Sequence, residues 1–211
     1  MKVVAFNGSP RQEGNTYHAL RIVADELEKE GVATEIIHVG EKSIKGCIAC
    51  GYCSRHKNET CVTKDDEVNG WIQQMKNADG IILGSPVHFS GIGGTMKSFL
   101  DRAFFVSSVN GGLFRHKVGT SVVAVRRSGG ISVFDQLNHF INYAEMLMPA
   151  SNYWNIIHGL KPGEALQDEE GIQIMRVLGK NMAWALNLVK NGKGNVKEPE
   201  QEGKIFTNFV R

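Results

Sequence analysis

Four cysteines gathered in a short stretch are the residues of this sequence best suited to metal or redox chemistry. Three of them are spaced two residues apart, and the fourth follows after seven further residues: Cys47, Cys50, Cys53 and Cys61. A structural zinc ion is usually held by two short cysteine pairs from separate segments, whereas three closely spaced thiols and a more distant fourth match the corners of a [4Fe–4S] cluster. The spacing favours such a cluster. Free or redox-active thiols, a zinc ion and an incidental disulfide remain alternatives.

A second set of polar residues follows the first apolar segment, and its composition suits a bound phosphate. Residues 3–6 are typical of a strand buried on both faces, and the loop after them leads into an amphipathic helix. Backbone N–H groups at the start of a helix bind anions well. The loop and the first helical turn add hydroxyl and amide donors, a permanent cation and a glycine: Ser9, Arg11, Gly14, Asn15 and Thr16. We therefore predict a phosphate site here.

The residues that this loop lacks narrow the kind of phosphate. A nucleoside triphosphate loop carries a lysine and then a serine or threonine after its second glycine, and a dinucleotide loop carries three closely spaced glycines. A phosphatase of similar topology would need a nucleophilic cysteine. None of these patterns occurs between Gly8 and Thr16. The terminal phosphate of FMN fits this hydroxyl-rich loop, and the alternative is a glycine-rich turn with a purely structural role.

The length and charge of the chain limit the classes of protein to which it can belong. Its 211 residues fit one globular domain, and its net charge of +2 comes from positive residues interleaved with negative ones. We therefore expect no nucleic-acid partner. The longest apolar runs have the length of strands, so we expect no signal peptide, no membrane span and a cytoplasmic location. In that reducing compartment, clustered cysteines indicate metal or redox chemistry rather than a disulfide framework.

Strands and helices alternate along the chain. Apolar runs predict five strands, at residues 3–6, 34–39, 80–84, 118–125 and 153–157. Helical spacing predicts a helix over residues 15–30 and further helices around residues 68–75, 96–103, 134–148 and 175–189. Because parallel strands need helical crossovers of one hand, this alternation predicts an α/β three-layer sandwich, with a parallel sheet between helices on both faces.

The loops after the first, third and fourth strands should meet at the carboxyl edge of that sheet, where ligands of open α/β sheets bind. The third loop offers a wall for a flavin ring, and the fourth offers backbone donors. These residues are Pro86, Val87, His88 and Phe89 in the third loop, and Ser128, Gly129 and Gly130 in the fourth. Arg126 or Arg127 could stabilise the anion that develops at the N1 edge of a reduced flavin. A core position for Phe89 and a plain loop role for His88 are the alternatives.

Three motifs in this order resemble the NADPH-dependent FMN reductase branch of the flavodoxin-like proteins: residues 8–16, 85–91 and 97–102. The resemblance extends to about residue 188 and implies a five-stranded parallel sheet in the order 2-1-3-4-5. It implies that the FMN phosphate lies on Ser9, Arg11, Asn15 and Thr16, and that the ring lies on residues 86–90, which include Ser90, and on residues 128–130. His88 is a departure, since relatives often carry tyrosine there. Asp101 and Arg102, in the third motif, are expected to form a structural ion pair rather than to act as catalysts.

The cysteine spacing is also similar to the compact motif of the iron-sulfur flavoproteins, which belong to the same group. The cysteine segment follows the second strand, so we expect it to emerge at the same edge as the flavin loops. A cluster there could exchange electrons with FMN in the same subunit or, as the resemblance suggests, with the FMN of a neighbour.

These inferences predict an FMN-binding domain over residues 1–190, with a cysteine-rich insertion at 46–62, and a C-terminal tail at 191–211 that packs on the body or on a neighbouring subunit. The predicted function is an FMN-dependent oxidoreductase that takes electrons from NAD(P)H or an electron-donor protein and passes them to an unidentified acceptor. The flavin would carry the chemistry, so no catalytic side chain is assigned. The alternatives are an electron carrier between ferredoxin-like partners and a non-catalytic flavin-binding module. The resemblance implies a homodimer or homotetramer.

Overall fold

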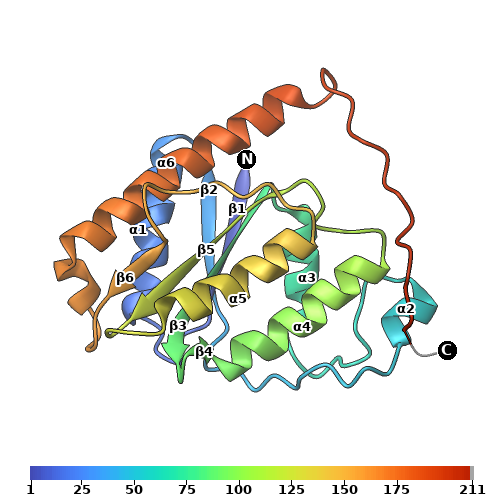
Figure 1. The fold of residues 1–211 in the computed structure, drawn as a ribbon, viewed down its shortest axis with the longest axis horizontal. Helices are drawn as coiled ribbons and strands as arrows, with labels where there is room; N and C mark the ends of the chain where they lie inside the picture. Colours follow the sequence, from blue (N-terminus) through green and yellow to red (C-terminus); the bar gives the residue numbers. More distant parts are fainter. Residues whose placement is uncertain (210–211) are drawn as a thin grey trace.

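The first apolar segment forms a central strand of a parallel sheet. The computed structural model describes residues 1–209, and Figure 1 shows the sheet between two layers of helices. Five parallel strands follow the order β2 (Ala33–His38), β1 (Lys2–Asn7), β3 (Gly80–His88), β5 (Val118–Val125) and β6 (Ile156–His158). This is the predicted flavodoxin-like order. A sixth strand, β4 (Gly91–Ile92), pairs antiparallel with the end of β3 and was not predicted.

Alternate side chains of β1 enter two separate cores, as expected for a strand buried on both faces. Val4 and Phe6 lie in one core and Val3 and Ala5 lie in the other. Three helices cover the first face: α3 (Val68–Asn77), α4 (Gly94–Val109) and α5 (Gly130–Tyr143). Two helices cover the second face: α1 (Asn15–Lys29) and α6 (Glu169–Gly192). The short helix α2 (Tyr52–His56) lies within the cysteine segment, and a 3₁₀ turn spans Glu164–Gln167.

Several predicted boundaries differ from the structure, and in two cases local polar contacts end the regular structure. The fifth parallel strand begins at residue 156 instead of 153, because Asn155 donates its side-chain amide to the carbonyl of Ser121 at 3.0 Å, within a turn that starts at Ser151. Helix α5 ends at residue 143 instead of 148. There Glu145 turns into the left-handed region with a φ of 54°. The carbonyl of Leu147 then accepts a hydrogen bond from the N–H of Gly119 in β5 at 2.9 Å.

The third strand is longer than the predicted range of 80–84. It continues to His88, because Val87 and His88 pair with Ile92 and Gly91 of β4. The predicted third loop is therefore mostly a short hairpin, in which Phe89 and Ser90 form the turn with φ values of 48° and 61°.

The C-terminal tail follows the body through polar contacts. Arg115 donates a hydrogen bond to the carbonyl of Pro199 at 3.2 Å, and the Nζ of Lys204 lies 3.3 Å from the hydroxyl of Tyr143. The side chains of Ile205 and Phe206 are largely exposed, with exposed fractions of 91% and 85%. Residues 210–211 of the predicted tail lie outside the described residues. Packing on a neighbouring subunit stays a prediction.

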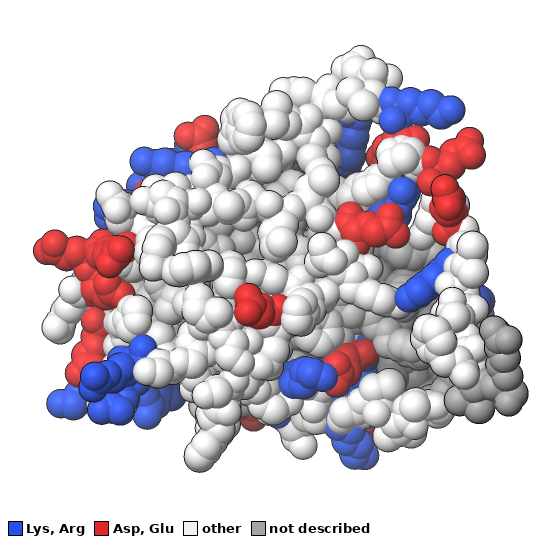
Figure 2. Space-filling model, in the orientation of Figure 1, with Lys and Arg blue, Asp and Glu red and all other residues white. Residues whose placement is uncertain are grey.

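The surface seen in Figure 2 is mostly uncharged, and lysine and arginine side chains lie close to aspartate and glutamate near its edges. None of the helices within residues 1–209 is both long enough and apolar enough to span a membrane.

Candidate flavin site and cysteine centre

The loop between β1 and α1 leads into a first helical turn whose backbone N–H groups have no partner within the helix. Gly14 is the N-cap of α1, and among residues 1–209 no side chain caps the helix there. The first helical hydrogen bond runs from the N–H of His18 to the carbonyl of Gly14 at 3.2 Å. The N–H groups of residues 15–17 therefore have no partner within the helix. This arrangement suits an anion placed at the start of α1.

Two hydroxyl groups at this helix start are suited to the same anion. Thr16 is 1% exposed, and its Oγ1 has no hydrogen-bond partner within the part of the chain that the structure describes. The Oγ of Ser9 accepts the N–H of Arg11 at 3.1 Å, which leaves its own proton free to donate. A buried hydroxyl without a partner costs free energy, and a phosphate oxygen would satisfy it. The residues present fit a phosphate group.

The other predicted phosphate residues are placed differently. The Oδ1 of Asn15 accepts the N–H of Ala165 at 3.2 Å, so its amide also holds the 3₁₀ turn against the loop. Arg11 is exposed, and its guanidinium reaches the carbonyl of Leu160 at 3.4 Å. At Gly14, a Cβ would lie 3.2 Å from the Oγ of Ser9. A larger residue at position 14 would therefore crowd the predicted cradle.

Neighbouring strands hold the phosphate loop in place. The N–H of Gly8 donates to the carbonyl of Gly84 in β3 at 2.8 Å. On the other side, Gly40 follows β2 and lies so close to the loop that a Cβ there would be 2.0 Å from the carbonyl oxygen of Ser9. Gly40 was not among the predicted site residues, although its position just after a strand at the carboxyl edge was a usable signal.

The predicted third and fourth loops meet, as expected for neighbouring strands β3 and β5. The carbonyl of Ser90 accepts hydrogen bonds from Ser132 at 2.9 Å and from Gln136 at 3.4 Å, both in α5. Phe89 is 98% exposed, so the alternative that placed it in the core is wrong. Pro86 and Val87 of the same strand end are half-buried. The hairpin therefore presents an exposed aromatic ring beside the fourth loop.

The fourth loop contributes to a cavity at the ends of β5 and β6. Arg127, Ser128, Gly129 and Gly130 line it, together with Trp154 and other residues. Gly129 has a φ of 89°, and a Cβ there would lie 3.1 Å from Val87. The glycine thus permits the close approach of the two loops. Arg126 and Arg127 are both exposed, and the predicted role at the flavin N1 stays untested for either.

All four cysteines line one cavity against the C-terminal half of α4. Cys47 and Cys50 are exposed, Cys53 is buried within α2, and Cys61 is half-buried. Burial raises the pKa of the Cys53 thiol, because the charged thiolate loses solvation. The four thiols are free, so the structure has no disulfide among them. Four cysteine donors around one hollow are the ligand set of a [4Fe–4S] cluster.

The cysteines do not converge as they would around a single ion. Within residues 1–209, no three or more histidine, cysteine, aspartate or glutamate side chains are grouped closely enough to hold one metal ion. The irons of a [4Fe–4S] cluster each take a separate cysteine, so its ligands need not share a point.

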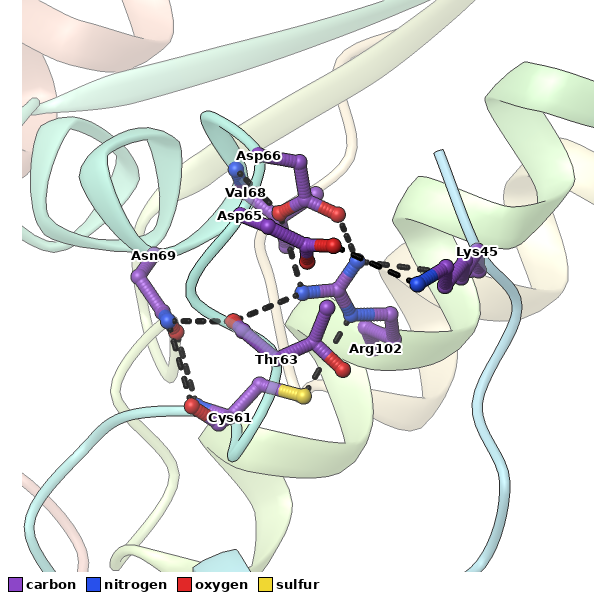
Figure 3. Close-up of polar contacts among 8 residues, drawn as sticks. All are labelled: Lys45, Cys61, Thr63, Asp65, Asp66, Val68, Asn69 and Arg102. Atoms are coloured by element: carbon purple, nitrogen blue, oxygen red, sulfur yellow. Dashed lines mark hydrogen bonds and ion pairs between the residues drawn. The ribbon is translucent and has the colours of Figure 1, made fainter. Parts of the chain in front are cut away.

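Cys61 is held by residues from two helices, as Figure 3 shows. Its backbone N–H donates to the Oδ1 of Asn69 at 2.7 Å, and the Nδ2 of Asn69 donates to its carbonyl at 3.1 Å. The Nε of Arg102 donates to the Cys61 sulfur at 3.3 Å. The predicted ion pair between Asp101 and Arg102 is therefore wrong. Asp101 binds Lys97 at 2.7 Å, and the buried Arg102 binds Asp66.

The two candidate sites contact different parts of α4. At its start, a Cβ on Gly93 would lie 3.3 Å from the carbonyl of Gly8 in the phosphate loop. The cysteine cavity begins at Arg102, eight residues after the first residue of α4. At 1.5 Å per residue this corresponds to about 12 Å along the helix axis. The cysteine segment leaves the sheet at the predicted edge, but in Figure 1 it then runs along α4 toward α2, so the cysteines do not join the flavin loops at that edge.

The fold and the phosphate loop define a flavodoxin-like flavin-binding protein. The chain belongs to the NADPH-dependent FMN reductase family, whose model matches residues 1–161. An iron-sulfur flavoprotein of Methanocaldococcus jannaschii is 35% identical over 197 residues, which cover 90% of this chain and 100% of that protein. An iron-sulfur flavoprotein of Archaeoglobus fulgidus is 29% identical over 202 residues, covering 90% of this chain and 98% of that protein.

Solved structures share this fold at low sequence identity. RosB, solved with a bound riboflavin-phosphate intermediate, aligns with a TM-score of 0.68 at 13% identity over 100% of this chain and 92% of RosB. An NAD(P)H:quinone oxidoreductase from Methanothermobacter marburgensis aligns with a TM-score of 0.62 at 14% identity over 86% of this chain and 96% of that protein. The family assignment confirms the predicted cofactor, FMN, and the predicted class, a flavin oxidoreductase.

Proposed function

We propose that this flavin oxidoreductase carries a [4Fe–4S] cluster on Cys47, Cys50, Cys53 and Cys61 and receives electrons through it from an electron-donor protein of the ferredoxin type. The observation that carries the proposal is the single cavity lined by all four cysteines. The relatives named iron-sulfur flavoproteins, which align over nearly the whole chain, support it. An exposed cluster edge at Cys47 and Cys50 would be accessible to a docked donor.

At the flavin site, the residues of this chain would bind FMN and orient its ring. Ser9, Thr16 and the open N–H groups at the start of α1 would hold the FMN phosphate, with Arg11 supplying a positive charge. Residues 86–90 and 128–130 would border the ring. When bound, FMN supplies hydride and electron transfer. The chain's own contribution is position and charge, and we assign no proton-transferring side chain.

The second candidate function is direct reduction of FMN by NAD(P)H, which the family assignment favours. Stopped-flow reduction of the oxidised protein separates the two. We expect the flavin to be reduced faster by a reduced ferredoxin than by NADPH or NADH at equal concentration. Faster reduction by NAD(P)H would contradict the donor-protein proposal and favour a reductase of the FMN reductase type.

Iron analysis tests the cluster itself. In protein purified without oxygen, we expect about four irons and four acid-labile sulfides per chain, together with flavin absorbance. Cys50→Ser should lose most of the iron and retain FMN, because the phosphate loop does not contact the cysteine cavity. Ser54→Ala, an exposed position in α2, is the matched control. Flavin without iron in the unaltered protein would refute the cluster.

The buried hydroxyl of Thr16 gives a direct test of the phosphate site. Replacing Thr16 with valine keeps the shape of the side chain and removes the donor. Because hydrogen bonds to charged groups contribute about 1.5–3 kcal/mol, FMN affinity should fall by about tenfold or more. Titration of the flavin-free protein with FMN, followed by flavin fluorescence, measures the change. Thr34→Val, in β2, should leave the affinity unchanged, and equal affinities for the two variants would argue against Thr16 as a phosphate ligand.

The homodimer or homotetramer stays a prediction. The exposed aromatic side chains Phe105 of α4 and Tyr143 at the end of α5 support a subunit interface on that side of the molecule.

A further inference from the structure

Arg102 is a buried cation whose donors are directed at the fourth cysteine, at the residues that follow it and at Lys45, just before the first cysteine. Its side chain is 1% exposed. Its terminal nitrogens donate to both carboxylate oxygens of Asp66 and to the carbonyls of Lys45 and Thr63, the latter two at 3.3 Å. The remaining donor, Nε, points to the sulfur of Cys61 at 3.3 Å. Figure 3 shows this arrangement.

Asp66 determines which donor reaches the sulfur. A guanidinium is planar and rigid, so a carboxylate that binds both terminal nitrogens also fixes the direction of the Nε–H bond. The side chain of Asp66 is 5% exposed, and it is further held by the N–H of Val68 at 3.2 Å. Asn69 fixes the backbone of Cys61 from α3. The distance between Nε and the sulfur is thus set by Asp66, which holds Arg102, and by Asn69, which holds Cys61.

We propose that Arg102 is a positioning residue of the cysteine centre that donates a hydrogen bond to the Cys61 ligand and raises the midpoint potential of a [4Fe–4S] cluster bound there. This inference rests on the proposed function. Reduction adds one negative charge to the cluster, and a buried cationic donor to a ligand sulfur stabilises the more negative state. Hydrogen bonds to sulfur and net charge are the protein's main means of setting such potentials.

The experiment is an anaerobic redox titration of the holoprotein, with the cluster followed by electron paramagnetic resonance. The variant Arg102→Met/Asp66→Asn removes the donor and its partner together, so net charge is unchanged and no charge is left buried alone. Lys97→Met/Asp101→Asn removes the exposed ion pair on the same helix and is the matched control. Arg102→Lys keeps the charge but lacks the Nε donor.

We expect Arg102→Met/Asp66→Asn to lower the ratio of reduced to oxidised cluster about tenfold at a fixed ambient potential, which for one electron corresponds to about 59 mV. Arg102→Lys should shift the ratio in the same direction, and the control pair should not shift it. A merely structural role would change thermal stability and leave the potential of the bound cluster unaltered. If the double variant fails to bind iron, the midpoint potential of the Arg102→Lys protein tests the proposal instead.

The inference is overturned if every Arg102 variant that binds iron has the midpoint potential of the unaltered protein, or if the control pair shifts it equally. Failure of the proposed function would look different, because the unaltered protein itself would then contain no iron. In that case the role assigned to Arg102 also falls.

Discussion

Replacing Gly40 with alanine is expected to weaken FMN binding by about 100-fold. The added Cβ would lie 2.0 Å from the carbonyl oxygen of Ser9 and 2.6 Å from that of Gly8, and both are backbone atoms that cannot rotate away. The N–H of Gly40 donates to the carbonyl of Asn7 at 3.1 Å, which limits movement on the other side. The phosphate loop must therefore shift, and losing about two hydrogen bonds to the phosphate accounts for a change of this size.

Titration of the flavin-free Gly40→Ala protein with FMN measures this effect. The control is Gly70→Ala in α3, where, among residues 1–209, an added Cβ would have no atom within 4 Å beyond its chain neighbours and the backbone of its own helix. That substitution should leave FMN affinity unchanged and stabilise the helix by about 0.5–1 kcal/mol. Circular dichroism of both variants distinguishes a local shift of the loop from unfolding. Unaltered affinity in a folded Gly40→Ala protein would show that FMN does not depend on this loop.

Replacing only one partner of the buried ion pair between Arg102 and Asp66 is expected to cause the largest loss in the free energy of unfolding. Arg102→Met leaves the carboxylate of Asp66 buried without its partner, and such a loss typically costs about 3–5 kcal/mol. Arg102→Met/Asp66→Asn should recover much of that cost, because no buried charge remains. Urea unfolding of the reduced, metal-free protein gives the free energies of unfolding for the complete double-mutant cycle.

The exposed pair of Lys97 and Asp101, four residues apart on the same helix, provides the comparison. Removing either partner there should cost less than about 1 kcal/mol, as is usual for ion pairs in solvent. Equal losses at the two pairs would contradict a buried role for Arg102. This cycle uses no cofactor, so its result is independent of FMN and of the cluster.

Much of the fold could be predicted because its signals are local. The fourth predicted strand, residues 118–125, has the bounds that the structure gives β5, and the helix predicted at 15–30 is α1, which ends one residue earlier. Continuous apolar runs and helical spacing are properties of neighbouring residues. The errors at residues 153–155 and 144–148 arose where a side chain such as Asn155, or a backbone turn such as that at Glu145, bonds to a different element.

The sequence by itself determined the family, the parallel sheet, the loop suited to a phosphate and the grouping of the four cysteines, because each depends on residue types at short spacing. The tertiary structure decided which distant residues support those sites. Gly40 lies against Ser9, and Arg102 turns away from its neighbour Asp101 to reach Asp66 and Cys61. Such contacts depend on how β2 meets β1 and how α4 packs beside the cysteine segment. Residues far apart in the chain meet there, and no local pattern encodes their partners.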